Sequence, residues 1–185
     1  MRKNFESQSW IHPMPVLIVG TYGADGTPDA MNAAWGGVYD TGLVMLCLAH
    51  EHVTTANIRA RKAFTVSFAD APHVAAADYV GLVSAAETPD KVARAGWHAQ
   101  KAQTVDAPLF EELPLALECE LVKFNEDGIV VGRIVSVSAD ESLLDENGRL
   151  DTDRMEAVVF DGVADCYRRV GEKVADAFSA GRQIG

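Results

Sequence analysis

The sequence lacks a long apolar run and an excess of positive charge. Its apolar stretches fall well short of the roughly 20 residues needed to cross a bilayer, and residues 1–6 lack the apolar segment of a signal peptide. The chain has 16 basic and 27 acidic side chains, and the resulting net charge of -11 repels phosphate backbones and anionic lipids. We therefore expect a cytoplasmic protein that binds neither nucleic acid nor membranes.

Cysteine pairs and several common functional motifs are also missing. The cysteines, Cys47, Cys119 and Cys166, are far apart and form no CxxC pair, so we expect buried, reduced thiols. The glycines of residues 20–26 match neither the dinucleotide-binding nor the nucleoside-triphosphate-binding motif, and no serine lies in a GxSxG motif. No pair of carboxylates lies in an apolar setting that would raise a pKa. Hydrolytic chemistry therefore has little support.

The overall composition is that of an ordinary globular protein. Hydrophobic residues make up 48% of the 185 residues and charged residues 23%. Chains of this length commonly form one domain. The sequence contains no internal repeat, low-complexity tract or linker, so residues 1–185 are expected to form a single domain.

Short strands joined by tight turns dominate the first part of the chain. The apolar run Pro15–Thr21 is followed by Ala24–Pro28, whose Asp-Gly pair favours a tight hairpin turn. A second strand is expected over Met31–Trp35, and the pair Gly36-Gly37 is expected to end it. A third strand, over Leu43–Ala49, is expected to be buried on both faces.

The rest of the chain adds strands, short helices and turn-rich segments. Asn125–Gly128 is the clearest hairpin turn in the sequence. The acidic stretch Asp140–Asp153 is expected on the surface, and the tail from Tyr167 is expected to be part helical. Four further strands are expected, over Phe64–Phe68, Leu115–Phe124, Ile129–Ser138 and Ala157–Phe160. The strand over Ala157–Phe160 is expected to be the last one in the chain.

Three short helices are expected beside these strands. One runs to Arg61 and is capped by the hydroxyl of Thr54 or Thr55, and the others cover Ala75–Val83 and Lys91–Ala95. Strands paired by tight turns, with the helices grouped in one region, predict a mainly β fold. The predicted architecture is an antiparallel barrel with short helical insertions, not a series of alternating βαβ units.

The entry to the first helix is a candidate anion site. His52, Thr54 and Thr55 lie where free amides and the positive end of the helix dipole favour a phosphate monoester. Plain helix capping, which needs only one of the two hydroxyls, is an equally good explanation. The histidines of His50-Glu51-His52 have no third ligand nearby, so no metal site is expected.

Two further features have alternative interpretations. Ser84 and Lys91 flank the turn Thr88–Asp90, so a hydroxyl and an ammonium group could converge on the same anion, although a solvated surface loop is the simpler alternative. Trp35 follows small residues and precedes two glycines, an arrangement that would let a flat ring approach the backbone. Burial in the core is the simpler alternative for a large aromatic residue.

In their order along the chain, these segments resemble the flavin reductase-like family, whose fold is the FMN-binding split barrel, and in particular its flavoredoxin-type members. The resemblance covers nearly the whole chain and is carried by PVLIVGTYGADGTPDAMNAAWGG, LVMLCLAHEHVTTANI, KAFTVSF, ADYVGLVSAAETPDKVARAG and IVVGRIVSVSAD. It implies a split antiparallel β-barrel with short helical insertions. It also implies a homodimer in which each FMN lies near the subunit interface.

The resemblance assigns eleven residues to the FMN site. The residues that match the family's contacts to the isoalloxazine ring are Asn32, Ala33, Ala34 and Trp35, and those beside the pyrimidine edge of the ring are Leu48 and Ala49. The residues that match the phosphate site are His52, Thr54 and Thr55, with Ser84 and Lys91 as further phosphate contacts. The chain departs from the family pattern at His50 and Glu51, where an arginine is common.

The activity implied by this resemblance is electron transfer through bound FMN. The expected function is that of an NAD(P)H-dependent flavin reductase, with NADH or NADPH as donor. The alternative is a flavoredoxin-like carrier that keeps its FMN and exchanges electrons with a protein partner. A third possibility is a binding barrel that has lost flavin. No catalytic side chain is expected, because the flavin carries the chemistry.

Overall fold

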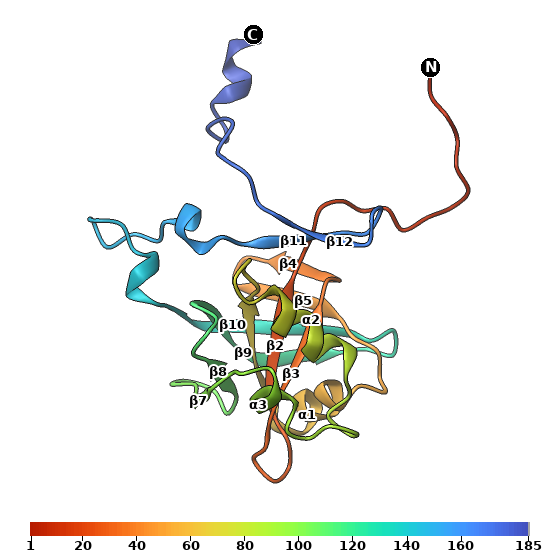
Figure 1. The fold of residues 1–185 in the computed structure, drawn as a ribbon, viewed down its shortest axis with the longest axis vertical. Coiled ribbons are helices and arrows are strands. Elements are labelled where there is room, and N and C mark those ends of the chain that lie inside the picture. The colour runs from red at the N-terminus through yellow and green to blue at the C-terminus, as the bar shows by residue number, and fades with distance from the viewer. Residues whose placement is uncertain (185) are drawn as a thin grey trace.

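A seven-stranded antiparallel sheet forms the body of the molecule in the computed structural model, which describes residues 1–184 (Figure 1). Its strand order is β3-β2-β6-β9-β10-β5-β4. The sheet curls into a half-barrel, which confirms the predicted mainly β split barrel. Its strands are β2 (Leu17–Tyr22), β3 (Pro28–Ala33), β4 (Gly36–Asp40), β5 (Leu43–Cys47), β6 (Ala63–Phe68), β9 (Leu115–Phe124) and β10 (Ile129–Ala139).

Two small sheets and three helices complete the fold. The small sheets are formed by β1 (Met14–Pro15), β11 (Val158–Asp161) and β12 (Cys166–Arg169), and by β7 (Ala99–Lys101) and β8 (Pro108–Phe110). The helices are α1 (Val53–Arg61), α2 (Val74–Leu82) and α3 (Lys91–Arg94), and single 3-10 turns occur at Glu141–Leu143, Thr152–Met155 and Ala180–Gln183. All three helices contact β3, and both chain ends extend away from the barrel on the same side (Figure 1).

Strand β2 is buried on both faces and separates two apolar clusters. Leu17 and Val19 pack with Phe64 inside the curled sheet, whereas Val16 and Ile18 pack beneath α2 and α3. This division follows the alternation of side chains along a strand. Within residues 1–184, no helix is both long and apolar enough to span a membrane.

The two expected hairpins are confirmed, and the register of each follows its turn. Strands β2 and β3 pair across the Asp25-Gly26 turn, with Ile18 opposite Asn32. Strands β9 and β10 pair across residues 125–128. Both turns contain a glycine with positive φ, Gly26 at +86° and Gly128 at +80°, a conformation that glycine adopts without steric cost.

The expected end of the second strand is wrong. Strand β3 stops at Ala33, and Gly36 and Gly37 do not end a strand but begin β4. Strand β4 is the edge of the sheet and pairs only with β5. The prediction relied on the low strand propensity of glycine, but an edge strand tolerates glycines that would weaken a central strand. Strand β5 is buried on one face only, since Met45 and Cys47 are half-exposed.

The structure of the tail also differs from the prediction. Val158–Asp161 is a strand, as expected, but it is not the last one. Cys166–Arg169 forms β12 and pairs with it, so that Phe160 lies opposite Tyr167. The strand has four residues, which is too short for its sequence alternation to be distinctive. All three cysteines are free, but only Cys119 is fully buried, so the expected burial of Cys47 and Cys166 is wrong.

A buried carboxylate fixes a loop beside the sheet. Glu118 on β9 is 1% exposed and accepts hydrogen bonds from the Thr104 amide (2.7 Å), the Thr104 hydroxyl (2.5 Å) and the Gln103 amide (3.4 Å). Burial raises the pKa of Glu118, but the hydrogen bonds from Thr104 and Gln103 outweigh burial and hold this pKa below its ordinary value. The contact buries Val105 against the sheet.

Glu118→Gln is expected to lower the free energy of unfolding near neutral pH by about 1 to 3 kcal/mol, because charge-assisted hydrogen bonds are lost in a buried site. The folded pKa is depressed, so this stabilisation is present above the ordinary value of 4.5 and is lost as the pH falls through the folded pKa. Urea unfolding at neutral and acidic pH measures it, with exposed Glu120→Gln as the control. Equal losses in both variants would contradict the role of Glu118.

Candidate functional site

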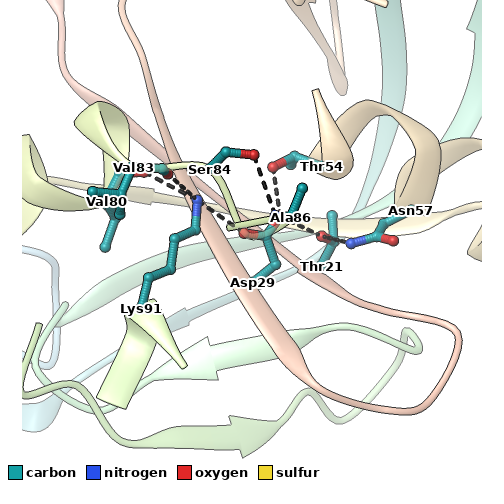
Figure 2. A network of polar contacts seen from close by, with 9 residues as sticks. All are labelled: Thr21, Asp29, Thr54, Asn57, Val80, Val83, Ser84, Ala86 and Lys91. Atoms are coloured by element: carbon teal, nitrogen blue, oxygen red, sulfur yellow. Dashed lines mark hydrogen bonds and ion pairs between the residues drawn. The ribbon is translucent and has the colours of Figure 1, made fainter. Parts of the chain in front are cut away.

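A buried polar network lies where β3 meets the helices (Figure 2). Asp29 on β3 is 3% exposed, and its Oδ2 accepts a hydrogen bond from the Thr54 hydroxyl at 2.6 Å. The same oxygen lies 3.5 Å from the Thr21 hydroxyl, which in turn accepts a hydrogen bond from Asn57 Nδ2 at 3.1 Å. Asp29 thus joins β3 to β2 and to the first turn of α1.

Lys91 completes this network from the opposite side. Its Nζ lies 3.0 Å from Asp29 Oδ1 and donates hydrogen bonds to the carbonyl oxygens of Val80 (3.2 Å) and Val83 (3.1 Å) (Figure 2). Lys91 is 3% exposed, so the simpler alternative of a solvated lysine is wrong. The ion pair therefore links α3 to β3, and the two carbonyl contacts link α3 to the end of α2.

The start of α1 has open backbone donors. The helix has no side-chain cap, and its first internal hydrogen bond runs from the Ala56 amide to the His52 carbonyl at 3.2 Å. The amides of Val53, Thr54 and Thr55 precede that bond and have no partner within the helix. The predicted capping role is wrong, because the Thr54 hydroxyl donates to Asp29 and the Thr55 hydroxyl donates to the Ala49 carbonyl at 2.8 Å.

A cavity of about 320 Å³ lies against this helix start. Strand β3, the first turn of α1, the residues at and after the end of α2, and Lys91 form its wall. Ser84 contributes an exposed hydroxyl, which accepts a hydrogen bond from the Ala86 amide at 3.2 Å and keeps its own proton free. The cavity therefore has amide and hydroxyl donors, but its one fully charged lining residue, Lys91, is already paired with Asp29.

A second cavity, of about 250 Å³, lies on the other side of Asn32. The two cavities share Asn32, Gly81 and Leu82, and Phe160 and Tyr167 from the small C-terminal sheet line the second. The Asn32 amide donates to the Ala77 carbonyl at 3.0 Å, which fixes this side chain at the junction. The two cavities thus lie next to each other along β3 and α2 and share lining residues where Gly81 closely approaches Asn32.

A phenol and a carboxylate meet in the second cavity. The Tyr167 hydroxyl donates to Asp78 Oδ1 at 2.7 Å, and it lies 3.4 Å from Asn32 Nδ2. Burial raises the pKa of Tyr167 to about 12, and the hydrogen bond to Asp78 and its charge add to that rise. Tyr167 therefore remains a neutral hydrogen-bond donor over the physiological pH range.

The structure brings together five of the eleven expected site residues. The first cavity is lined by Asn32, His52, Thr54, Ser84 and Lys91. These residues come from β3, α1, the segment after α2 and α3, which are far apart in the sequence. Ala34 lines the second cavity, so it lies near this group without joining it.

The remaining five expected residues have other surroundings. The side chains of Ala33 and Leu48 are buried in the apolar cluster of the barrel, and that of Thr55 is fully buried. Ala49 is exposed. Trp35 is 61% exposed, so the interpretation as a core residue is wrong, and it lines a separate, mainly apolar cavity of about 470 Å³.

Comparisons with known proteins agree with this architecture. Residues 9–155 match the model of the flavin reductase like domain. Flavoredoxin of Desulfovibrio vulgaris (Miyazaki F) is 36% identical, with 98% of this chain and 100% of that chain covered and a TM-score of 0.93. The chain belongs to the flavin reductase-like family. Its similarity to that flavoredoxin also supports the predicted flavoredoxin type.

More distant structures share the fold of this flavin reductase-like chain. Flavoredoxin from Methanosarcina acetivorans is 23% identical, with 100% of both chains covered and a TM-score of 0.89. An FMN-binding domain of a flavin reductases-like enzyme from Shewanella baltica OS155 is 17% identical, with 88% of each chain covered and a TM-score of 0.78. A comparison with curated proteins finds no match.

Three polar residues of the site were not expected from the sequence. Asp29 could have been suspected, because a carboxylate on a strand that packs against the core needs a partner. Asp78 and Tyr167 lie in segments that resemble the family but were not assigned to the site, since they meet through the contact of α2 with β12, which lie far apart in the chain. Their contact depends on tertiary structure.

Gly81→Ala is expected to lower stability, because the added Cβ would lie 2.9 Å from Asn32 Cβ at the junction of the two cavities. Overpacking costs about 1 to 3 kcal/mol, which exceeds the gain of about 1 kcal/mol in helix propensity. Thermal unfolding measures the change. Gly37→Ala is the matched control, since its Cβ would meet no atom within 4 Å. A Gly81→Ala variant as stable as the parent would contradict this tight approach.

Proposed function

We propose that the chain is an FMN-dependent oxidoreductase that binds the FMN phosphate at the start of α1. The observation that carries this proposal is the coincidence of open amides at residues 53–55 with a cavity of about 320 Å³. Amides at a helix start, together with the helix dipole, favour a bound phosphate. The Ser84 hydroxyl adds a free donor, so the residues present fit a phosphate monoester.

The neighbouring second cavity would accept the rest of such a ligand. In this proposal, Met31 and Leu82 flank the ribityl chain, while Asn32 and Ala34 lie beside the ring. Residues 33, 35, 48 and 49 line neither of the two cavities, and the proposal gives them backbone contacts to the ring, since the side chains of Ala33 and Leu48 are buried in the core. This assignment keeps all eleven expected residues but gives some of them only backbone roles.

The chemistry of the site belongs to the flavin, which supplies hydride or single-electron transfer when it is bound. The chain's own residues bind and orient the cofactor. Tyr167 and Asn32, which are fixed by Asp78 and by the Ala77 carbonyl, would shape the ring side of the cavities, and Phe160 would contribute an apolar surface there. No side chain is required as a general acid or base.

A second copy of the chain is proposed to cover the exposed face around Trp35. Trp35, Val38 and Tyr39 are 61%, 87% and 49% exposed, and they lie on or next to the edge strand β4. Exposed apolar side chains in a contiguous group favour a protein interface. A homodimer would bury them and would bring the partner close to Ala34 and the ring.

Two functions are compatible with such a site. The leading candidate is an NAD(P)H-dependent flavin reductase, because a nicotinamide can stack on an accessible flavin ring without a Rossmann motif of its own. The alternative is an electron carrier that keeps its FMN and exchanges electrons with a redox protein. The 36% identity to a protein named flavoredoxin favours this alternative.

The purified protein is expected to take up FMN and become yellow. Under anaerobic conditions, rapid bleaching of the flavin absorbance by NADH or NADPH would identify the reductase. Bleaching by a reduced iron-sulfur protein, with no reaction to either nicotinamide, would identify the carrier. A protein that stays colourless with excess FMN contradicts both functions.

A further inference from the structure

We propose that Asp29 is a built-in counterion that competes with the ligand's phosphate for Lys91 and Thr54, and so keeps the flavin exchangeable. This inference rests on the proposed function. Asp29 does not line the cavity itself, but it lies directly behind two residues that do, at 2.6 Å from the Thr54 hydroxyl and 3.0 Å from Lys91 Nζ (Figure 2).

The Thr54 hydroxyl cannot serve as a donor to an anion in the cavity while Asp29 holds its proton. A threonine hydroxyl has one proton, and that proton is donated to Asp29 Oδ2. Only lone pairs then remain on the hydroxyl oxygen, and these repel the oxygens of a phosphate. The contribution of Thr54 to phosphate binding is therefore limited to its backbone amide.

Lys91 is restrained in a similar way. An ammonium group has three protons, and two of them are donated to the carbonyls of Val80 and Val83. Asp29 Oδ1, which has no hydrogen-bond partner within the described part of the chain, lies 3.0 Å from Nζ and holds it by charge. Two of the three protons are thus donated and the charge of Nζ is compensated by Asp29, so Lys91 offers a phosphate at most one proton and no uncompensated charge.

The charges around the cavity also indicate that a phosphate is bound weakly. Asp29 and Lys91 are both 3% exposed, so their opposite charges cancel in a poorly screened environment. His52 is exposed and is the only other basic residue of the lining. The site thus offers a phosphate dianion neutral donors and a helix dipole but no uncompensated buried cation, in a chain of net charge -11.

Asp29→Asn would release a donor in either orientation of the new amide. If the amide oxygen faces Thr54, its NH2 group faces Lys91 Nζ and turns the ammonium toward the cavity. If the NH2 group faces Thr54, it donates to the hydroxyl oxygen, and the hydroxyl proton becomes free for a phosphate. Lys91 keeps its two carbonyl acceptors at the negative end of α2.

The functional consequence concerns the exchange of the cofactor. A site whose only buried lining cation is compensated holds phosphate weakly and lets FMN leave, as a reductase that delivers reduced flavin requires. An electron carrier instead requires a site that binds the phosphate tightly and retains the FMN. The charge at position 29 is therefore proposed to decide between a released and a retained flavin.

The test compares Asp29→Asn with the parent chain by fluorescence titration with FMN and with riboflavin, which has no phosphate. FMN is expected to bind about tenfold or more tightly to the variant, because a negative charge close to the phosphate is removed, whereas riboflavin binding stays unchanged. Asp25→Asn, in the exposed turn before β3, is the control for the change in net charge. The gain is expected to disappear in the double variant Asp29→Asn with Lys91→Met.

Unchanged or weaker FMN binding by a folded Asp29→Asn variant would overturn the inference, because Asp29 would then only position its neighbours. If the variant does not fold, the affinities of the parent chain for FMN and for riboflavin test the inference instead. The parent chain supports a compensated site if it binds FMN less than about tenfold more tightly than riboflavin, and a larger preference for FMN overturns the inference.

Failure of the proposed function would be distinguishable from failure of this inference. If neither protein binds FMN or riboflavin, the proposed function fails, and inorganic phosphate becomes the probe. A larger rise in the thermal unfolding midpoint with phosphate than with chloride of equal ionic strength, seen in Asp29→Asn and not in the parent, would retain the inference. Equal shifts in both proteins would overturn it.

Discussion

The buried ion pair between Asp29 and Lys91 is the constraint on which the site depends. Each residue is 3% exposed, and leaving one partner of a buried pair uncompensated costs about 3 to 5 kcal/mol. The pair therefore fixes α3 against β3, the carbonyl contacts of Lys91 fix the end of α2, and the hydroxyl of Thr54 fixes the start of α1. The wall of the first cavity is a consequence of these contacts.

The same arrangement separates the task of holding the wall from that of binding the ligand. The charges of Asp29 and Lys91 are used to join helices to the sheet, whereas the donors that remain free at the first cavity are backbone amides and the Ser84 hydroxyl. Neutral donors bind an anion less tightly than an unpaired lysine would. A flavoprotein built in this way gains precise positioning at the expense of affinity.

Local signals in the sequence were sufficient for the barrel and for part of the site. The Asp-Gly turn before Pro28 and the turn at residues 125–128 determine two hairpins, and alternation along β2 determines the core. Local sequence does not reveal which polar side chains pair across the fold. Lys91 was expected to contact the phosphate or to be solvated, and its ion pair with Asp29 could not be read from local sequence, while Tyr167 acquires its role only through Asp78 on α2.

The most direct test of the phosphate position is the amide chemical shifts of the 15N-labelled protein with FMN and with riboflavin. FMN is expected to shift the amides of Val53, Thr54 and Thr55, which have no partner within α1, and riboflavin is expected to leave them nearly unchanged. Both flavins are expected to shift Asn32. FMN-specific shifts confined to other parts of the chain would contradict a phosphate site at the start of α1.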